Sequence, residues 1–370
     1  VFSPPGVTNR FMTMEFMWAF SKKAAVFGDH YSGGNCTRFG IFSILYGVYG
    51  NYWFSMLGER RGPVLIDALK EQGYDLRLFA SASLSFPEFN KTCFVNVPRE
   101  GIYDEPKGKS QADKDIEITA KFTDFIRKRK SGLPRTLAAS EKVRGRPYFA
   151  FIFYDASHGG YEYPPGFEKF KPASGQVNYL TLDRATAMPL FNKYRNSIRF
   201  EDSLIGAILK AVERAGGLKD TAVLVMGDHG EAFFETGYHG HNRAYSAGEV
   251  KVPLVFYVPG RAPSAVKFPT SHMDIVPALM KLIGVKNPPA DYSSGTDILA
   301  ASAPPFTAAF SWDTSALIKD ERALVMPLEA YKGGLKLYDA DYKVVPGRKA
   351  MEPYMPYLVD FQKEAKRFYK

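Results

Sequence analysis

Cysteine is scarce in this chain of 370 residues, which contains only Cys36 and Cys93. Two cysteines exclude a disulfide framework, although a single bridge between them is possible. Long apolar runs are also missing: no stretch of 18 apolar residues occurs, so the sequence predicts no membrane-spanning helix. No internal repeat, low-complexity tract or secretory signal is visible, and the abrupt start at Val1 is interpreted as a cut point.

Nucleic-acid-binding modules are missing as well, although the chain is basic, with a formal net charge of +9. The only dense basic run, Arg127 to Gly132, is followed by Pro134 and is interpreted as a solvated helix end. A positive net charge instead favours an anionic partner such as a phosphate ester, a sulfate ester or an anionic membrane. Aromatic residues make up 15% of the chain, which favours a Phe-rich core over a surface for sugars or lipid.

Helical patterns alternate with short apolar runs along most of the chain, which predicts an α/β fold. We expect a three-layer α/β/α sandwich with a mostly parallel central sheet over residues 1–290. Residues 291–370 contain short strand-like patterns, which predict a small C-terminal α+β extension on the same domain. Buried strands are expected in Pro147–Gly160, Thr221–Gly230 and Lys251–Gly260. Helices are expected in Phe200–Asp220 and His272–Val285, and a helix followed by a strand in Gly62–Ser81.

Histidine is also rare, yet three of the six histidines lie close together. His229, His239 and His241 follow directly after an apolar, β-branched run, and Asp228 precedes the first of them. Just past a strand end the backbone can turn an aspartate and the next histidine toward one ion, and Gly230 allows a tight exit. Carboxylate oxygen and imidazole nitrogen suit Zn²⁺ or Mn²⁺. The pattern therefore predicts a metal site.

A threonine near a predicted helix start is the candidate nucleophile. Two glycines and Asn35 precede Thr37, and an apolar helical pattern follows it. Its ordinary role there is an N-cap. Its functional role is a hydroxyl among free backbone N–H groups that bind anions, with a pKa that a nearby metal would lower. Arg38 beside it could hold a phosphate or sulfate oxygen.

Another strand end carries a further histidine. His158 follows a predicted strand, and the carboxyl ends of parallel strands meet at one edge of a sheet. We therefore expect His158 to lie either on a surface loop or near the metal site, where it could bind the anion or protonate a leaving group. His272 is interpreted as structural, and the role of His30 is left open.

These motifs resemble the alkaline phosphatase superfamily in its sulfatase-like branch, from about Trp18 to about Val285. The carrying residues are the Thr37 segment, the strand TAVLVMGDHGE, and GYHGHN followed by VPLVFYVPG. Within the branch the chain is similar to phosphoethanolamine and phosphoglycerol transferases. It is most similar to the sulfatase-like periplasmic domains of Gram-negative inner-membrane proteins of the YejM/PbgA type. The resemblance implies a periplasmic location and a membrane anchor in a segment outside this chain.

The resemblance also implies roles for individual residues and a divalent metal, Zn or Mn, with Mg or Ca as alternatives. Thr37 takes the position of the nucleophile and of a metal ligand. His241 takes the position of a histidine that contacts the phosphate or a second metal, and His239 is its rival. The implied set is catalytic Thr37, His158 and His241; substrate-binding Arg38, Asn35 and His239; and metal-binding Asp228, His229 and Thr37.

Two departures from the family pattern bear on function. Cys36 is not followed by the proline of the formylglycine motif, so a formylglycine sulfatase is not expected. The family's first strand, which ends in an acidic metal ligand, has no room before Thr37.

The leading prediction is a metal-dependent phosphoryl- or sulfuryl-ester enzyme that acts on an anionic envelope lipid or glycan. The alternative is a catalytically silent domain that binds lipid or protein and regulates envelope lipid synthesis.

Overall fold

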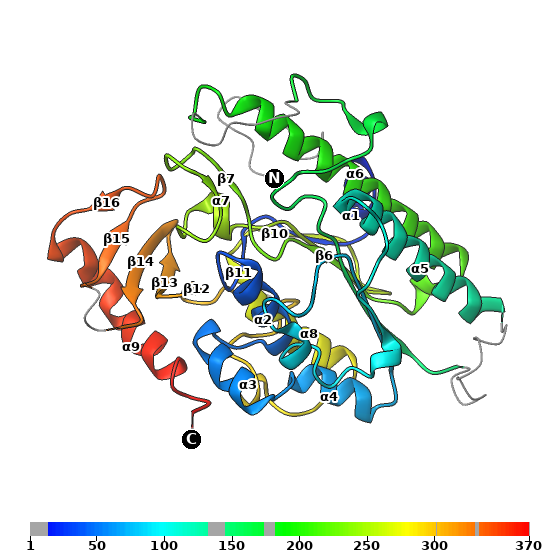
Figure 1. Ribbon diagram of the computed structural model, residues 1–370. Coiled ribbons are helices and arrows are strands. Elements are labelled where there is room, and N and C mark those ends of the chain that lie inside the picture. The colour runs from blue at the N-terminus through cyan, green and yellow to red at the C-terminus, as the bar shows by residue number, and fades with distance from the viewer. Residues whose placement is uncertain (1–13, 132–144, 174–181, 301, 330–332, 370) are drawn as a thin grey trace.

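The computed structural model describes residues 14–131, 145–173, 182–300, 302–329 and 333–369. Strands and helices alternate through most of this part of the chain, and the strands lie between two groups of helices (Figure 1). The predicted α/β/α architecture is therefore confirmed. Among the described residues, no helix combines the length and apolarity needed to cross a bilayer.

The helices form two layers, one on each side of the strands. On one side α5 and α6 pack against each other and α1 packs on α6; on the other side α2, α4 and α8 contact one another. Helix α2 is buried along nearly its whole length, whereas α6 is a long amphipathic helix that ends at Arg214, two residues before Gly216. The bounds are α1 Glu15–Ser21, α2 Thr37–Tyr46, α3 Trp53–Glu59, α4 Val64–Glu71, α5 Gln111–Ser131, α6 Met188–Arg214, α7 Ala247–Val250 and α8 Ile275–Leu282.

The strands between these layers form two separate sheets, and the short strands pair outside them as β11-β2 and β7-β8. One is parallel throughout, in the order β4-β3-β5. The other has the order β10-β1-β9-β6, in which β1 and β10 are parallel and β9 runs antiparallel to both of its neighbours. The sheet region is thus mixed around β9. The bounds are β1 Ala25–Phe27, β2 His30–Tyr31, β3 Asp75–Ala80, β4 Ile102–Tyr103, β5 Tyr148–Phe153, β6 Val223–Met226, β7 Ala232–Phe233, β8 His239–Gly240, β9 Leu254–Tyr257, β10 Ser264–Val266 and β11 Thr270–Ser271.

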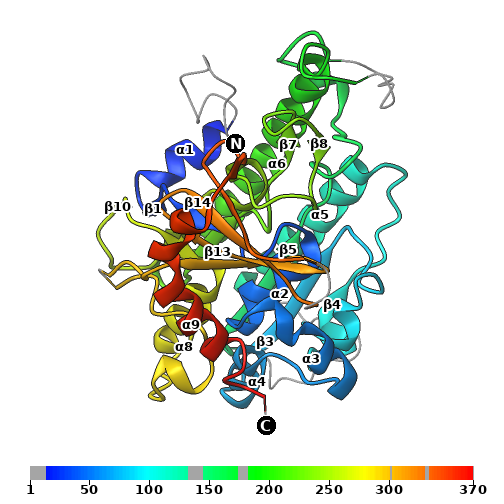
Figure 2. The same cartoon turned by 90° about the vertical axis from the view of Figure 1, so that its left-hand side faces the viewer.

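The C-terminal residues form an antiparallel sheet of five strands, with a final helix against it (Figure 2). Phe310, Leu317 and Leu324 from this sheet belong to the same hydrophobic cluster as Phe42 of α2 and Phe256 of β9. One core therefore extends from the α/β layers into the extension. The bounds are β12 Thr307–Phe310, β13 Thr314–Lys319, β14 Arg322–Pro327, β15 Lys336–Tyr338, β16 Val344–Val345 and α9 Met355–Glu364.

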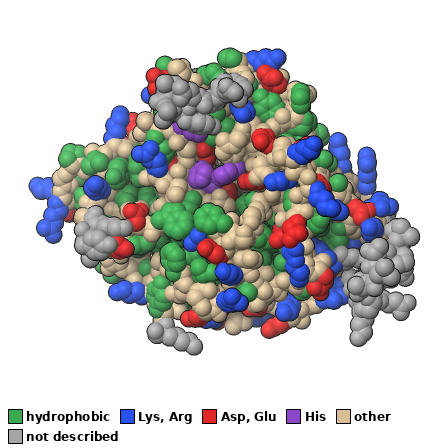
Figure 3. Space-filling view, viewed as in Figure 1, with side chains coloured by type: hydrophobic (Ala, Val, Ile, Leu, Met, Phe, Trp, Pro, Cys, Tyr) green, Lys and Arg blue, Asp and Glu red, His purple; other side chains and the backbone are tan. Residues whose placement is uncertain are grey.

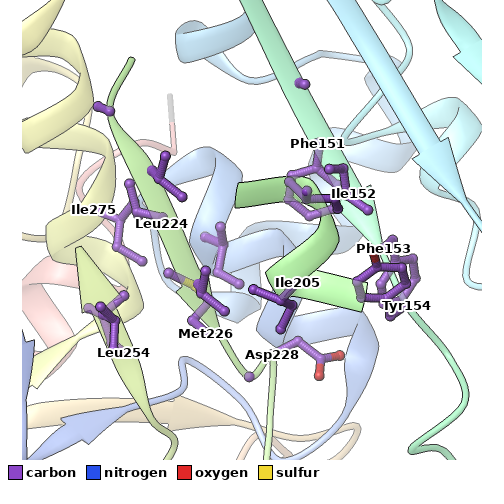
Figure 4. A pocket seen from close by; sticks show the side chains of 18 of the residues that line it. Phe151, Ile152, Phe153, Tyr154, Ile205, Leu224, Met226, Asp228, Leu254 and Ile275 are labelled. Carbon is purple, nitrogen blue, oxygen red and sulfur yellow. The ribbon is translucent and has the colours of Figure 1, made fainter. Parts of the chain in front are cut away.

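A cavity of about 1530 Å³ lies between β5 and β6. Figure 4 shows apolar side chains of both strands around it, with Ile205 of α6 between them and Asp228 at one end. Every residue of β5 and β6 is only half-buried as a result. The expectation that these two strands are buried on both faces is therefore wrong, whereas β9 is buried along most of its length.

Both cysteines are free and buried. The single bridge that the sequence left open does not form. Burial raises the pKa of the Cys36 thiol to about 11, against the opposing effect of backbone hydrogen bonds. Cys36 is thus held as a neutral thiol at physiological pH, which makes it a poor nucleophile.

Candidate active site

Helix α2 begins at Thr37, with Cys36 at its N-cap position. Thr37 Oγ1 lies 3.1 Å from His229 Nε2, at the end of β6. The close approach of the two elements depends on Gly40, because a Cβ there would lie 2.2 Å from the Asp228 carbonyl oxygen. Ser32 Oγ donates to the same oxygen at 2.5 Å. Local contacts of the backbone, and not a cap, therefore place the Thr37 hydroxyl beside His229.

The geometry around His229 fixes its tautomer. Its Nδ1 lies 2.8 Å from the Gly230 carbonyl oxygen, which can only accept, so Nδ1 carries the proton of the neutral ring. Burial lowers the pKa of His229, although the charge of Asp228 opposes this. Nε2 is then an unprotonated nitrogen that accepts from Thr37 Oγ1 at 3.1 Å and lies 3.7 Å from Asp228 Oδ2. A metal ion could bind this nitrogen in place of the Thr37 hydroxyl proton.

A second histidine and a carboxylate complete the cluster. His241 Nδ1 lies 2.8 Å from Glu231 Oε2, and the rings of His229 and His241 are 4.3 Å apart. Burial opposes charging of His241, but its hydrogen bond with Glu231 and that carboxylate's charge raise its pKa overall. His229, Glu231 and His241 each offer a ligand atom, and these atoms all lie within 4.8 Å of one another. Two imidazoles and a carboxylate fit Zn²⁺ or Mn²⁺.

Sequence reasoning missed Glu231 and Tyr161. The Tyr161 hydroxyl donates to Glu231 Oε1 at 2.8 Å and lies 2.8 Å from His239 Nε2, which is placed to donate to it. Tyr161 thereby fixes both the carboxylate and the third histidine of the motif. Glu231 had a signal, since it sits two residues after His229. Tyr161 had none, because its contacts bridge a separation of 70 residues or more.

His158 reaches the same cluster from the end of β5. Its ring lies 5.4 Å from that of His241. Two buried carboxylates hold its loop: Asp115 Oδ2 accepts from the backbone N–H of Ala156 at 2.8 Å, and Glu201 Oε1 accepts from that of Ser157 at 2.7 Å. Of the two positions expected for His158, a surface loop or a place near the other site histidines, this placement favours the second.

Arg38, in contrast, is directed elsewhere. Its guanidinium makes an ion pair with Glu88 at 2.9 Å and lies over the rings of Trp312 at 4.1 Å and Trp53 at 4.9 Å. The side chain is buried, and burial lowers its pKa against the opposing charge of Glu88. The structure thus places Arg38 in an aromatic setting next to, but outside, the histidine cluster.

Asn35 and Glu249 hold the loop that carries His241. Asn35 Nδ2 donates to the Ala244 carbonyl oxygen at 3.1 Å, and Asn35 O accepts from Asn242 N. The Glu249 carboxylate accepts from the backbone N–H of Arg243 at 3.0 Å and of Ala244 at 2.9 Å. Asn35 is therefore an anchor of this loop as well as a neighbour of Thr37.

The remaining two histidines lie in the core. His272 Nε2 lies 3.2 Å from the Gly227 carbonyl oxygen, and Nδ1 lies 3.2 Å from Ser43 Oγ. Burial lowers its pKa to about 4, so the ring is neutral. His30 is also fully buried and contacts Thr270 Oγ1 through Nδ1 at 2.9 Å. The structural interpretation of His272 agrees with these contacts, and His30 has the same setting.

Five of the predicted site residues thus lie together where the carboxyl ends of β5 and β6 meet the start of α2: Thr37, His158, Asp228, His229 and His241. Figure 3 shows histidine side chains near the centre of this face of the molecule. The profile of the sulfatase family matches residues 8–285. The chain belongs to the sulfatase family.

Individual relatives agree with this assignment. The inner membrane protein YejM of Salmonella typhimurium is 24% identical over 352 residues, which are 94% of this chain and 51% of that protein. The chain therefore spans about half the length of this relative. Among solved structures, a phosphonate monoester hydrolase from Silicibacter pomeroyi has a TM-score of 0.69 at 15% identity, covering 96% of this chain and 90% of that one. The lipoteichoic acid synthase LtaP from Listeria monocytogenes has a TM-score of 0.67 at 14% identity, covering 96% of this chain and 86% of that one.

These findings confirm the predicted resemblance to the sulfatase-like branch of the alkaline phosphatase superfamily, and the structural likenesses show its fold. The site agrees with a divalent metal, since a possible His/Glu site is present. The individual roles predicted for the site residues stay predictions.

Proposed function

We propose that this protein is a divalent-metal-dependent enzyme that moves the phosphoryl or sulfuryl group of an ester first onto Thr37 and then onto a second acceptor. The observation that carries the proposal is the 3.1 Å approach of Thr37 Oγ1 to His229 Nε2, which puts the hydroxyl within reach of an ion held by that nitrogen. A hydroxyl beside such an ion, at the start of a helix whose free N–H groups attract anions, suits an activated nucleophile.

His229, Glu231 and His241 would hold the ion, with Asp228 and Thr37 beside them. When bound there, Zn²⁺ or Mn²⁺ supplies Lewis-acid chemistry that lowers the pKa of a coordinated hydroxyl. Glu231 is the addition that the geometry makes to the ligand set expected from the sequence. The hydrogen bond from Tyr161 orients this carboxylate, as hydrogen bonds from neighbouring residues commonly do for metal ligands.

The chain's own residues then divide the work. Thr37 gives its hydroxyl proton to water, and Oγ1 attacks the phosphorus or sulfur of the ester while the bond to the leaving oxygen breaks. His158, in its protonated form, donates a proton to that oxygen. Attack by water or an acceptor hydroxyl on the Thr37 ester then frees Thr37. Asp115 and Glu201 keep the His158 loop in place through backbone hydrogen bonds.

The basic charge and the relatives support a substrate and a location. A net charge of +9 favours an anionic substrate, and we infer an anionic lipid or glycan ester of the cell envelope. Because the YejM relative is an inner membrane protein, we place the chain on the periplasmic side of the inner membrane, anchored by a segment outside residues 1–370. The solved phosphonate monoester hydrolase and lipoteichoic acid synthase support phosphorus esters as the first class to test.

The test compares the parent protein with Thr37→Ala after loading with Mn²⁺ or Zn²⁺, using a chromogenic phosphodiester and a chromogenic sulfate ester. We expect turnover by the parent and none by the variant, because no neighbouring hydroxyl replaces the covalent step. The lost hydrogen bond should lower the free energy of unfolding by only about 1 kcal/mol. Thr123→Ala on α5 is the matched control, because its hydroxyl bonds only within its own helix, and it should retain parental turnover.

Equal rates in the parent and in Thr37→Ala would end the nucleophile assignment. A parent that turns over neither ester, and that binds no metal by elemental analysis after loading, would instead support the silent regulatory domain.

A further inference from the structure

Three aromatic side chains surround the guanidinium of Arg38. The ring centre of Trp312 lies 4.1 Å from Arg38 Cζ, that of Phe86 5.8 Å and that of Phe54 6.0 Å. Trp312 lies in the turn between β12 and β13, Phe86 in the loop that follows β3, and Phe54 in α3. The C-terminal sheet and two parts of the α/β layers thus meet at one place, and we call these three residues the aromatic patch.

The aromatic patch is exposed, although its members are large and apolar. Phe86 is 69% exposed, Phe54 55% and Trp312 42%. Within the described parts of the chain, only five Phe and Trp side chains are exposed, so most of them lie in this patch. Single apolar side chains at a surface are ordinary, but a cluster of them marks a site of interaction. The patch is therefore expected to bind something.

The patch borders the candidate active site on two sides. On one side Arg38, at the centre of the patch, directly follows Thr37. On the other side Ser311, which precedes the tryptophan of the patch, donates through Oγ to Asn242 Oδ1 at 3.3 Å, in the loop that carries His241. Figure 3 shows hydrophobic side chains gathered beside the histidines on this face. A molecule whose ester group lies at Thr37 therefore extends over the patch if it is long enough.

The polarity of the patch favours a hydrocarbon chain as the occupant. Arg38 is only 5% exposed and forms an ion pair with Glu88 at 2.9 Å, so the floor of the patch has no net charge to attract a second anionic group. A sugar ring stacked on the aromatic side chains would need partners for its hydroxyls. In the adjoining loop, however, the hydroxyls of Ser83 and Ser85 bond to each other at 2.7 Å.

We propose that the aromatic patch is the subsite for the hydrocarbon chain of an amphiphilic ester whose anionic group lies at Thr37. This inference rests on the proposed function for the position of the anionic group, and it narrows the substrate from a lipid or glycan to an ester with an aliphatic chain near the reacting group. Contact with the rings removes the chain from water. Each CH₂ group that is fully covered should raise the affinity by about fourfold.

Binding of methylphosphonate and octylphosphonate tests the proposal without requiring turnover. Isothermal titration calorimetry is carried out with and without Mn²⁺, below the concentration at which octylphosphonate forms micelles. We expect the parent to bind octylphosphonate at least about tenfold more tightly than methylphosphonate. The double variant Phe54→Ala/Phe86→Ala should lose most of this ratio and keep the parental affinity for methylphosphonate. Trp18→Ala is the matched control, because Trp18 is a 47% exposed aromatic side chain on α1, and it should keep the parental ratio.

Equal affinities of the parent for the two phosphonates would overturn the subsite and leave the Thr37 chemistry to its own test. An equal loss in Trp18→Ala would place the chain elsewhere, and a lost affinity for methylphosphonate in the double variant would mean that the rings only support the site. Tighter binding of a hexose phosphate than of octylphosphonate would assign the patch to a sugar. A patch-dependent preference for octylphosphonate in a protein without turnover would support the subsite and reject the proposed chemistry.

Discussion

Glu231 is the residue on which the electrostatics of the candidate site depend. Its carboxylate contacts His241 at 2.8 Å and accepts from Tyr161 at 2.8 Å. Burial by itself would raise the pKa of Glu231, but the hydrogen bond and charge of His241 and the Tyr161 hydroxyl lower it overall. The carboxylate is thus ionised at neutral pH and stabilises a proton or a cation beside it.

Replacing Glu231 with Gln should have two effects. The affinity for Zn²⁺ or Mn²⁺ should fall, because one of three ligand atoms loses its charge. The pKa of His241 should also fall, since the carboxylate that raises it is gone. Isothermal titration with each metal and an NMR titration of the metal-free protein measure these effects. Glu235→Gln is the control, and a His241 pKa that is the same in parent and Glu231→Gln would contradict the assignment.

Gly40 is required by space and not by backbone conformation. A Cβ there would lie 2.2 Å from the Asp228 carbonyl oxygen, so alanine must push α2 away from β6. We expect Gly40→Ala to lower the free energy of unfolding by about 1–3 kcal/mol and to reduce turnover, because Thr37 moves with α2. Chemical denaturation and steady-state rates measure both.

Gly58 provides the matched control for this substitution. It lies in α3, and a Cβ there would meet nothing within 4 Å. Gly58→Ala should therefore raise the free energy of unfolding by about 0.5–1 kcal/mol through its better helix propensity. If Gly40→Ala were equally benign, the close packing of α2 on β6 would not be what positions Thr37.

At the scale of elements, the loop after β5 is held by buried acids from two helices. Burial raises the pKa of Glu201, and the charge of Asp115 raises it further. Because the folded-state pKa lies above the ordinary value of about 4.3, folding binds a proton at pH values between the two. The resulting stabilisation is complete below about pH 4.3 and is lost as pH rises through the folded-state pKa.

The free energy of unfolding should therefore fall as pH rises from about 5 to about 8, and Glu201→Gln should reduce this fall. Gln keeps an oxygen for the Ser157 backbone N–H, which Glu201 Oε1 accepts at 2.7 Å, but removes the titration. Urea denaturation of both proteins at a series of pH values measures the slope. Two parallel stability curves would show that Glu201 titrates as it does in the unfolded chain.

Elements with a strong periodic pattern could be predicted from the sequence, and elements that depend on distant partners could not. The predicted helices α4, α6 and α8 and strands β3, β5, β6 and β9 are all present, because their apolar spacing is local information. The half-burial of β5 was missed, since it depends on the cavity between β5 and β6. The ion pair of Arg38 with Glu88 was missed because it joins residues 50 positions apart.

In the candidate site, too, the residues in short local motifs could be predicted and those that depend on distant partners could not. Thr37, Asp228 and His229 could be selected from short motifs, and the structure brings them together. The Tyr161 contact with Glu231 and the carboxylates behind His158 depend on how α5, α6 and the β5 loop pack. The hydrophobic pattern of those helices indicates which face is buried, but not which polar group the buried face will meet.

At the scale of the whole molecule, the C-terminal sheet is part of the core. Phe310, Leu317 and Leu324 pack in the same cluster as Phe42 of α2, and Phe39 and Trp312 have ring contact at 6.1 Å. A chain that ends at Ala300 would expose this side of α2. We expect it to lose cooperative thermal unfolding or to aggregate, as measured by calorimetry and light scattering. A truncated chain with an unchanged melting temperature would show that the α/β layers are stable alone.

The contacts of Gly40 and Ser32 with the Asp228 carbonyl oxygen also bear on how such a site decays. Both contacts involve the backbone of residue 228, so they support the fold whether or not catalysis is selected. A lineage that lost the chemistry would be free to replace His229 or Glu231, but it would still be constrained at Gly40 and Ser32. Retention of the glycine alone is therefore no sign of an active enzyme, whereas joint retention of Thr37, His229 and Glu231 is the pattern that selection for turnover leaves.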